Sequence, residues 1–121
     1  MATIKAHIDL EQSKKLAEIL PLKSADMYHF IDDTDKVGFG YRKITADFYS
    51  KTKLEYIPCW SLAALLKVIR ETIGYTLYGL SNIRIICELG DRPWSYTTKV
   101  YDNEVDACVE MIEKLHELDL L

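Results

Sequence analysis

Three segments carry apolar residues at helical spacing. In residues 61–74, "SLAALLKVIRETIG", the i, i+3, i+4, i+7 positions are Leu62, Leu65, Leu66 and Ile69. Residues 103–118 repeat this stripe with Val105, Cys108, Ile112 and Leu115. A shorter stripe in residues 9–20 stops before Pro21, because the residue preceding a proline avoids the helical region. The pattern predicts three helices, each with one face on a core.

Capping residues support the starts of these helices. Asp9 and Gln12 have the spacing of a capping box. Ser61 is an expected N-cap, and Trp60 and Leu65 then have the N′ and N4 spacing of a hydrophobic staple. Asp102 or Asn103 caps the last helix, where Glu110 and Lys114 are spaced as an i, i+4 ion pair.

Alternating patterns predict strands elsewhere in the chain. Residues 83–89 and 94–100 flank the turn sequence "GDRP" and predict an antiparallel hairpin. The core-facing positions of its second strand are Trp94, Tyr96, Thr98 and Val100. Residues 27–31 and 37–44 also favour strands around a polar loop, and residues 44–50 extend or pair with the second of them. Strand order in residues 27–57 stays open. We therefore expect residues 1–121 to form a single small α+β domain, with a mainly antiparallel sheet and about three helices packed on it.

Length and charge exclude several classes of function. The 121 residues suit one domain, and a net charge of −4 offers no basic field for a nucleic acid partner. Residues 102–121 hold seven acids and one base. Such a run usually indicates a solvated helix face, and the alternative is an acidic surface for a basic partner. No segment approaches 18 apolar residues, and the first residues lack a signal-peptide core. We expect a cytoplasmic protein that does not bind membranes.

Cys59 is the candidate nucleophile, because it lies just before a helix N-terminus that would lower the pKa of a thiol. Such an enzyme also needs a general base, and the one histidine downstream is His116 in the acidic last helix. The sequence therefore favours a structural Cys59 and predicts no catalytic residue.

No metal or cofactor site is expected from the spacing of ligand residues. The three cysteines are odd in number and widely spaced, without a CxxC pair, which argues against zinc and against disulfides. The histidines His7, His29 and His116 lie in separate elements. No dinucleotide or P-loop motif occurs.

Aromatic residues give the one positive binding signal. Eight of the thirteen aromatics are tyrosines, which combine an apolar ring with a polar tip and are common in interfaces. The simpler interpretation is that these tyrosines cover the edges of a small sheet core. The binding interpretation names a surface of Trp60, Trp94, Tyr96 and Tyr101.

Two segments carry a resemblance to a known family. "PCWSLAALLKVI" (58–69) and "DNEVDACVEMIEKLHELDLL" (102–121) resemble a family of short uncharacterised proteins encoded by phages and prophage-like elements of anaerobic gut bacteria. That family carries Pro-x-Trp-Ser-Leu and Asn-x-Val-Asp-Ala motifs, and residues 11–28 are similar to its N-terminal segment. Here Cys59 replaces a common alanine and Glu104 a common proline. The family has no assigned activity, so the resemblance implies only the context of a mobile element.

These observations favour a small non-enzymatic accessory or binding protein of phage type. Its partner would be a host or phage protein, or a second copy of the chain in a homo-oligomer. The alternative is a domain that binds or sequesters a small ligand, with an aromatic pocket for a nucleotide-like metabolite.

Overall fold

The computed structural model describes residues 5–31, 37–41, 55–79, 82–89 and 94–121. The expected loop at 32–36, the segment 44–50 and the turn at 90–93 lie outside these ranges. For several strand residues, Trp94 among them, the structure describes the backbone but not the side chain.

Each predicted helix forms and begins at its expected cap. α1 spans Leu10–Ala17, and Asp9 and Gln12 form both hydrogen bonds of the capping box. A 3-10 turn, η1, follows at Leu22–Ser24. α3 spans Leu62–Thr72 behind Ser61, whose hydroxyl accepts the N–H of Ala64. α4 spans Glu104–Glu117 behind Asn103.

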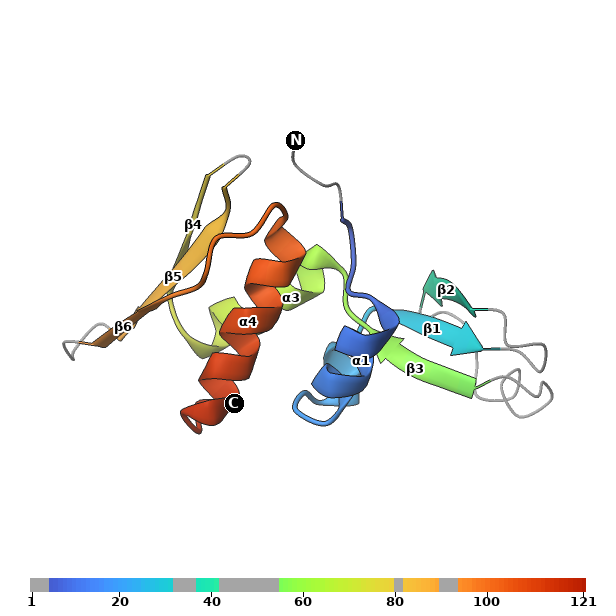
Figure 1. The fold of residues 1–121 in the computed structure, drawn as a ribbon. Helices are drawn as coiled ribbons and strands as arrows, with labels where there is room; N and C mark the ends of the chain where they lie inside the picture. Colours follow the sequence, from blue (N-terminus) through green and yellow to red (C-terminus); the bar gives the residue numbers. More distant parts are fainter. Residues whose placement is uncertain (1–4, 32–36, 42–54, 80–81, 90–93) are drawn as a thin grey trace.

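The strands form two antiparallel sheets with the helices between them (Figure 1). The first sheet has the order β2-β1-β3, with β1 at Met27–Ile31, β2 at Val37–Tyr41 and β3 at Glu55–Cys59. The second has the order β4-β5-β6, with β4 at Tyr75–Tyr78, β5 at Arg84–Leu89 and β6 at Trp94–Thr97. The α+β class with antiparallel strands is confirmed. β3 and β4 were not expected from the sequence.

The hairpin of β5 and β6 forms as expected, but its register changes beyond Thr97. Cys87 pairs with Tyr96, whereas Ile83 pairs with Tyr101, so one extra residue enters the second chain segment. Thr98 binds Ile85 twice, donating its N–H to the carbonyl and accepting the Ile85 N–H at its hydroxyl, each at 3.0 Å.

This bulge corrects the expected position of Val100. Two residues on one strand oppose one on the other, which moves the following side chains to the opposite face. Val100 is therefore 54% exposed, and Tyr101 takes the inward position that strict alternation assigned to Val100.

The buried side chains form one cluster that reaches both sheets. Trp60 and Leu65 are both fully buried in it, as the staple requires. The Trp60 indole N–H donates to Ser24 Oγ at 2.9 Å. Trp60 is therefore a core residue and has no surface to offer a partner, which corrects its assignment to the binding surface.

Candidate functional site

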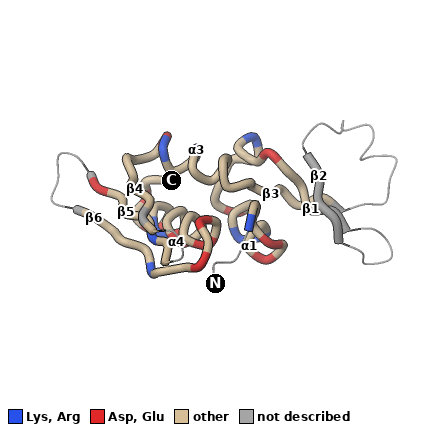
Figure 2. Tube along the Cα trace, turned by 90° about the horizontal axis from the view of Figure 1, so that it is seen from above, with Lys and Arg blue, Asp and Glu red and all other residues tan. Residues whose placement is uncertain are grey.

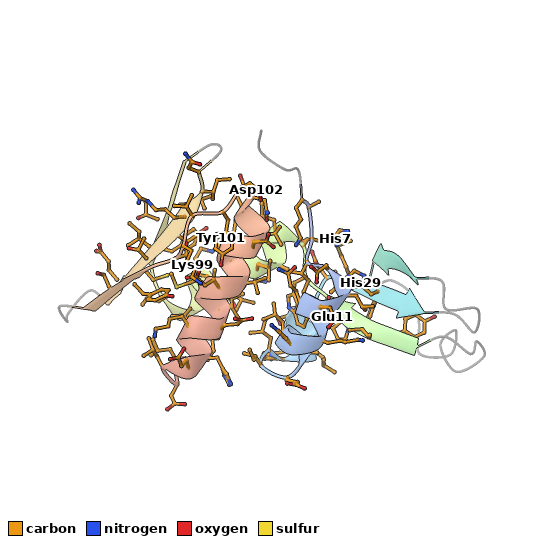
Figure 3. All side chains as sticks on the ribbon, viewed as in Figure 1. His7, Glu11, His29, Lys99, Tyr101 and Asp102 are labelled. Carbon is orange, nitrogen blue, oxygen red and sulfur yellow. The ribbon has the colours of Figure 1, made fainter. Side chains whose placement is uncertain are left out.

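A groove of about 430 Å³ lies where α4 meets the segment after β6 and the start of α1. We call it the tyrosine groove. It is lined by Lys5, Asp9, Gln12, Tyr96, Lys99, Tyr101, Asp106, Val109, Glu110 and Glu113. Lys99 and Tyr101 lie beside α4 in Figure 3.

Glu110 organises one wall of this groove. Its carboxylate accepts the hydroxyls of Tyr96 and Tyr101, each at 2.9 Å, and the backbone N–H of Lys99 at 3.1 Å. We call these groups the Glu110 cluster. Burial and then the neighbouring carboxylate raise the pKa of Tyr101 to about 12, and the same two causes raise the pKa of Tyr96. Both phenols therefore remain protonated donors at neutral pH.

The bulge after β6 is what assembles the Glu110 cluster. It turns Tyr101 inward and leaves the N–H of Lys99 free of the β-ladder, so that this group reaches Glu110. Lys114 does not pair with Glu110 as its spacing predicted. It forms an ion pair with Glu117 at 3.5 Å and lies 5.2 Å from the centroid of the Tyr96 ring.

Asp106, one turn before Glu110 on α4, joins the groove to the N-terminal segment. Its carboxylate accepts Lys5 Nζ, Gln12 Nε2 and Asn103 Nδ2, each at 2.8 Å. Burial alone would raise the pKa of Asp106, but these three hydrogen bonds outweigh it and the pKa is lowered. Asp106 is therefore ionised and holds residues from three elements together.

Glu113 is the carboxylate of the groove that remains available. Among the residues that the structure describes, it forms no hydrogen bond and no ion pair. The groove has four acidic and two basic lining residues, and Figure 2 shows acidic positions along both α4 and α1. Glu113 can therefore receive a positive group from outside.

The four residues of the expected binding surface separate in the structure. Tyr96 and Tyr101 both line the tyrosine groove. Trp60 is in the core. Trp94 begins β6, and its side chain lies outside the described part of the structure.

A second polar cluster, which the sequence did not indicate, lies beside α1 at the other sheet. His7 Nδ1 and His29 Nε2 lie 2.8 and 3.0 Å from the carbonyl oxygen of Ile8, and Cys59 Sγ lies 3.6 Å from it. His7 Nδ1 is 3.8 Å from Cys59 Sγ, and the three donor atoms lie within 4.8 Å of one another. Figure 3 shows the two histidines close together. We call this the Ile8 cluster.

Sequence reasoning missed the Ile8 cluster because its members come from three separate segments. The chain before α1 runs beside the end of β3, with Ile8 N–H donating to the Trp60 carbonyl at 3.2 Å. This contact brings His7 to Cys59. The one available signal was an alternation in β1, which places His29 on the same face as buried Met27.

Cys59 lacks the features of a nucleophile despite its histidine neighbour. The side chain is 0% exposed, and burial raises the pKa of its thiol to about 11. A reactive cysteine needs access and a lowered pKa. As a donor set, however, two imidazoles and a thiol are groups that bind transition metals.

No family model, curated protein or solved structure matches this chain. The resemblance to the phage-encoded family therefore stays a prediction. Within the described ranges, none of the helices has the length and apolar character needed to span a membrane.

Proposed function

We propose that the protein is a small accessory protein that binds another protein through the tyrosine groove. The resemblance to phage-encoded proteins supports a mobile-element context and a cytoplasmic location. The observation that carries the proposal is the construction of the groove: it brings two tyrosine rings and the Glu113 carboxylate, which pairs with none of the described residues, to one concave surface.

The walls of the groove favour a protein partner over a small molecule. Its volume falls within the range of small-molecule pockets, but such pockets are mainly apolar with a few free polar groups. Here Glu110 and Asp106 are already bonded to groups of the same chain. Tyrosine rings with polar tips are typical of the wet, polar surfaces of transient protein interfaces.

Charge defines the kind of partner. Four carboxylates and two lysines line the groove, so an anionic nucleotide-like metabolite would meet net repulsion. A lysine or arginine side chain could pair with Glu113 and lie against the Tyr96 and Tyr101 rings. We therefore infer a partner with a basic side chain at its contact surface, supplied by a host or phage protein or by a second copy of this chain.

The experiment is capture with a photo-crosslinking residue at exposed Lys99, followed by affinity measurement with the recovered partner. We expect Glu113→Lys to weaken binding about tenfold or more, because it places a positive charge against the partner's basic group. Glu88→Lys on β5 is the matched control, since its carboxylate is exposed and outside the groove. Equal affinities for the two variants would refute the groove as the contact surface.

Light scattering on the purified chain measures its oligomeric state, and so distinguishes a second copy of the chain from a host or phage protein as the partner. A dimer that Glu113→Lys dissociates identifies a second copy as the occupant. A monomer that yields no Lys99 crosslink in host lysate contradicts the proposal.

A further inference from the structure

We propose that His7, His29, Cys59 and the carbonyl of Ile8 form a structural binding site for a divalent transition metal ion of the zinc type. No residue of this site lines the tyrosine groove, so the inference is independent of the proposed function.

Four of the six distances among these atoms can be compared with the edges of a tetrahedron around a metal ion. Typical zinc bond lengths give edges of about 3.6 Å between sulfur and either nitrogen or oxygen, and about 3.4 Å between nitrogen and oxygen. The distances from Cys59 Sγ are 3.6 Å to the Ile8 oxygen and 3.8 Å to His7 Nδ1. The two nitrogen–oxygen distances, 2.8 and 3.0 Å, are hydrogen-bond lengths. They need to lengthen by about half an ångström to accept an ion. The two remaining edges, from His29 to His7 and to Cys59, lie within 4.8 Å, against about 3.4–3.6 Å in a tetrahedral site.

Hydrogen bonding alone explains the cluster poorly. A ring nitrogen approaches a carbonyl oxygen closely only as an N–H donor, and the Cys59 thiol is a third donor to the same oxygen. A carbonyl oxygen has two lone pairs. Three donors therefore converge on one acceptor in a place where Cys59 is fully buried and His29 is 5% exposed.

The hydroxyl of Ser13 is a second observation beside the site. Ser13 is fully buried, and its Oγ has no hydrogen-bond partner of regular geometry among the described groups. It lies close enough to Cys59 for a weak side-chain hydrogen bond, which lowers the pKa of the thiol against the larger effect of burial. A metal-bound thiolate would accept a hydrogen bond from this hydroxyl, which is the usual support that outer groups give to metal ligands.

Proton balance is simple in this site. Each neutral imidazole keeps its one proton, which moves from the coordinating nitrogen to the other ring nitrogen. The thiol loses its proton to solvent, so one proton is released for each ion bound. No oxidant or further reactant is needed.

The donor types select the ion. Thiolate and imidazole favour zinc-like ions over magnesium or calcium, which take oxygen ligands. Four protein donors leave no open position for a substrate, so the site is structural and not catalytic. The ion would tie the segment before α1 to β1 and to the end of β3.

Co²⁺ titration of the metal-stripped full chain tests this directly. We expect one equivalent to bind, with a thiolate-to-cobalt charge-transfer band and the intense visible bands of tetrahedral cobalt. Zn²⁺ should displace the Co²⁺, and Mg²⁺ should not. Cys59→Ala should weaken binding at least about 100-fold, since loss of groups behind a ligand already costs about 10–100-fold.

Cys87→Ala is the matched control. Cys87 is also fully buried, and burial also raises the pKa of its thiol to about 11, but it lies on β5. Its Co²⁺ affinity should equal that of the wild type. A charge-transfer band that survives in Cys59→Ala, or a folded wild-type chain that binds no Co²⁺, overturns the proposal.

A measurement on the wild-type chain covers the case in which Cys59→Ala does not fold. The ¹¹³Cd chemical shift of the cadmium-loaded protein reports its donor atoms. We expect a value for one sulfur with nitrogen ligands. A value for oxygen ligands alone overturns the assignment.

Discussion

The Glu110 cluster gathers three donors from the neighbouring segment 96–101, whereas the Ile8 cluster gathers donors from three separate segments, and each does so around a single acceptor group. The carboxylate of Glu110 has about four lone-pair positions for three donors, whereas the Ile8 carbonyl has two for three donors. The first cluster is complete within the protein. The second has more donors than its acceptor can satisfy. We therefore infer a bound ligand for the Ile8 cluster, and for the Glu110 cluster only a role in positioning the tyrosines.

The largest effect should follow removal of the Glu110 acceptor. Glu110→Ala leaves two hydroxyls and the Lys99 N–H without their partner, and we expect a loss of about 2–3 kcal/mol in the free energy of unfolding. Chemical denaturation measures it. Glu113→Ala is the control, and it should change stability by less than about 0.5 kcal/mol because the described residues offer Glu113 no partner. Equal losses would show that the hydrogen bonds of Glu110 are not what stabilises this wall.

Acid should reveal the contribution of Asp106. Its pKa is lowered in the folded protein, because the Lys5, Asn103 and Gln12 hydrogen bonds outweigh burial. Its stabilisation is therefore fully present above the unfolded pKa near 3.8 and is lost as the pH falls through the lower folded value. At neutral pH, Asp106→Asn should cost about 1.5–2 kcal/mol, the lower end of the range for hydrogen bonds to a charged group, because the amide oxygen of Asn can still accept one donor.

Denaturation at a series of pH values compares this variant with the wild type. The difference in stability should disappear below the folded pKa of Asp106. A difference that persists unchanged in acid would mean that the charge of Asp106 contributes nothing.

The smallest effect should follow removal of one donor from the Ile8 cluster. Without metal, Cys59→Ala leaves the carbonyl with two donors, so the cost is only that of a small buried volume, about 1 kcal/mol. Thermal unfolding of the metal-stripped variant measures it. A loss as large as that of Glu110→Ala would contradict the contrast between the two clusters.

The sequence predicted the features whose causes are local. Helix caps, apolar stripes and the β5–β6 hairpin depend on residues a few positions apart, and each is found where it was expected. Tyr96 and Tyr101, two of the four residues named for a binding surface, line one groove, although strict alternation had placed Val100 and not Tyr101 on the face of Tyr96.

The missed elements depend on contacts between distant residues. β3 contains Pro58, which argues against a strand, but β3 is the last strand in the order β2-β1-β3, and a sheet edge tolerates proline. Val100 was misplaced because the alternating pattern cannot show that Thr98 uses its hydroxyl in the ladder. His7 reaches Cys59 only because the segment before α1 lies along the chain at Trp60.

The attachment of this same segment has a consequence for synthesis of the chain. Ala6 and Ile8 bond to Leu62 and Trp60, while Lys5 bonds to Asp106, 101 positions away. Residues 5–8 are synthesised well before α4, so the contact of Lys5 with Asp106 can form only after α4 has left the ribosome. Closing a flexible chain over that length costs about 4 kcal/mol of entropy beyond a constant. A bulky fusion partner attached before Lys5 should therefore slow the formation of the Lys5–Asp106 contact, and folding kinetics with and without the partner would show how late this contact forms.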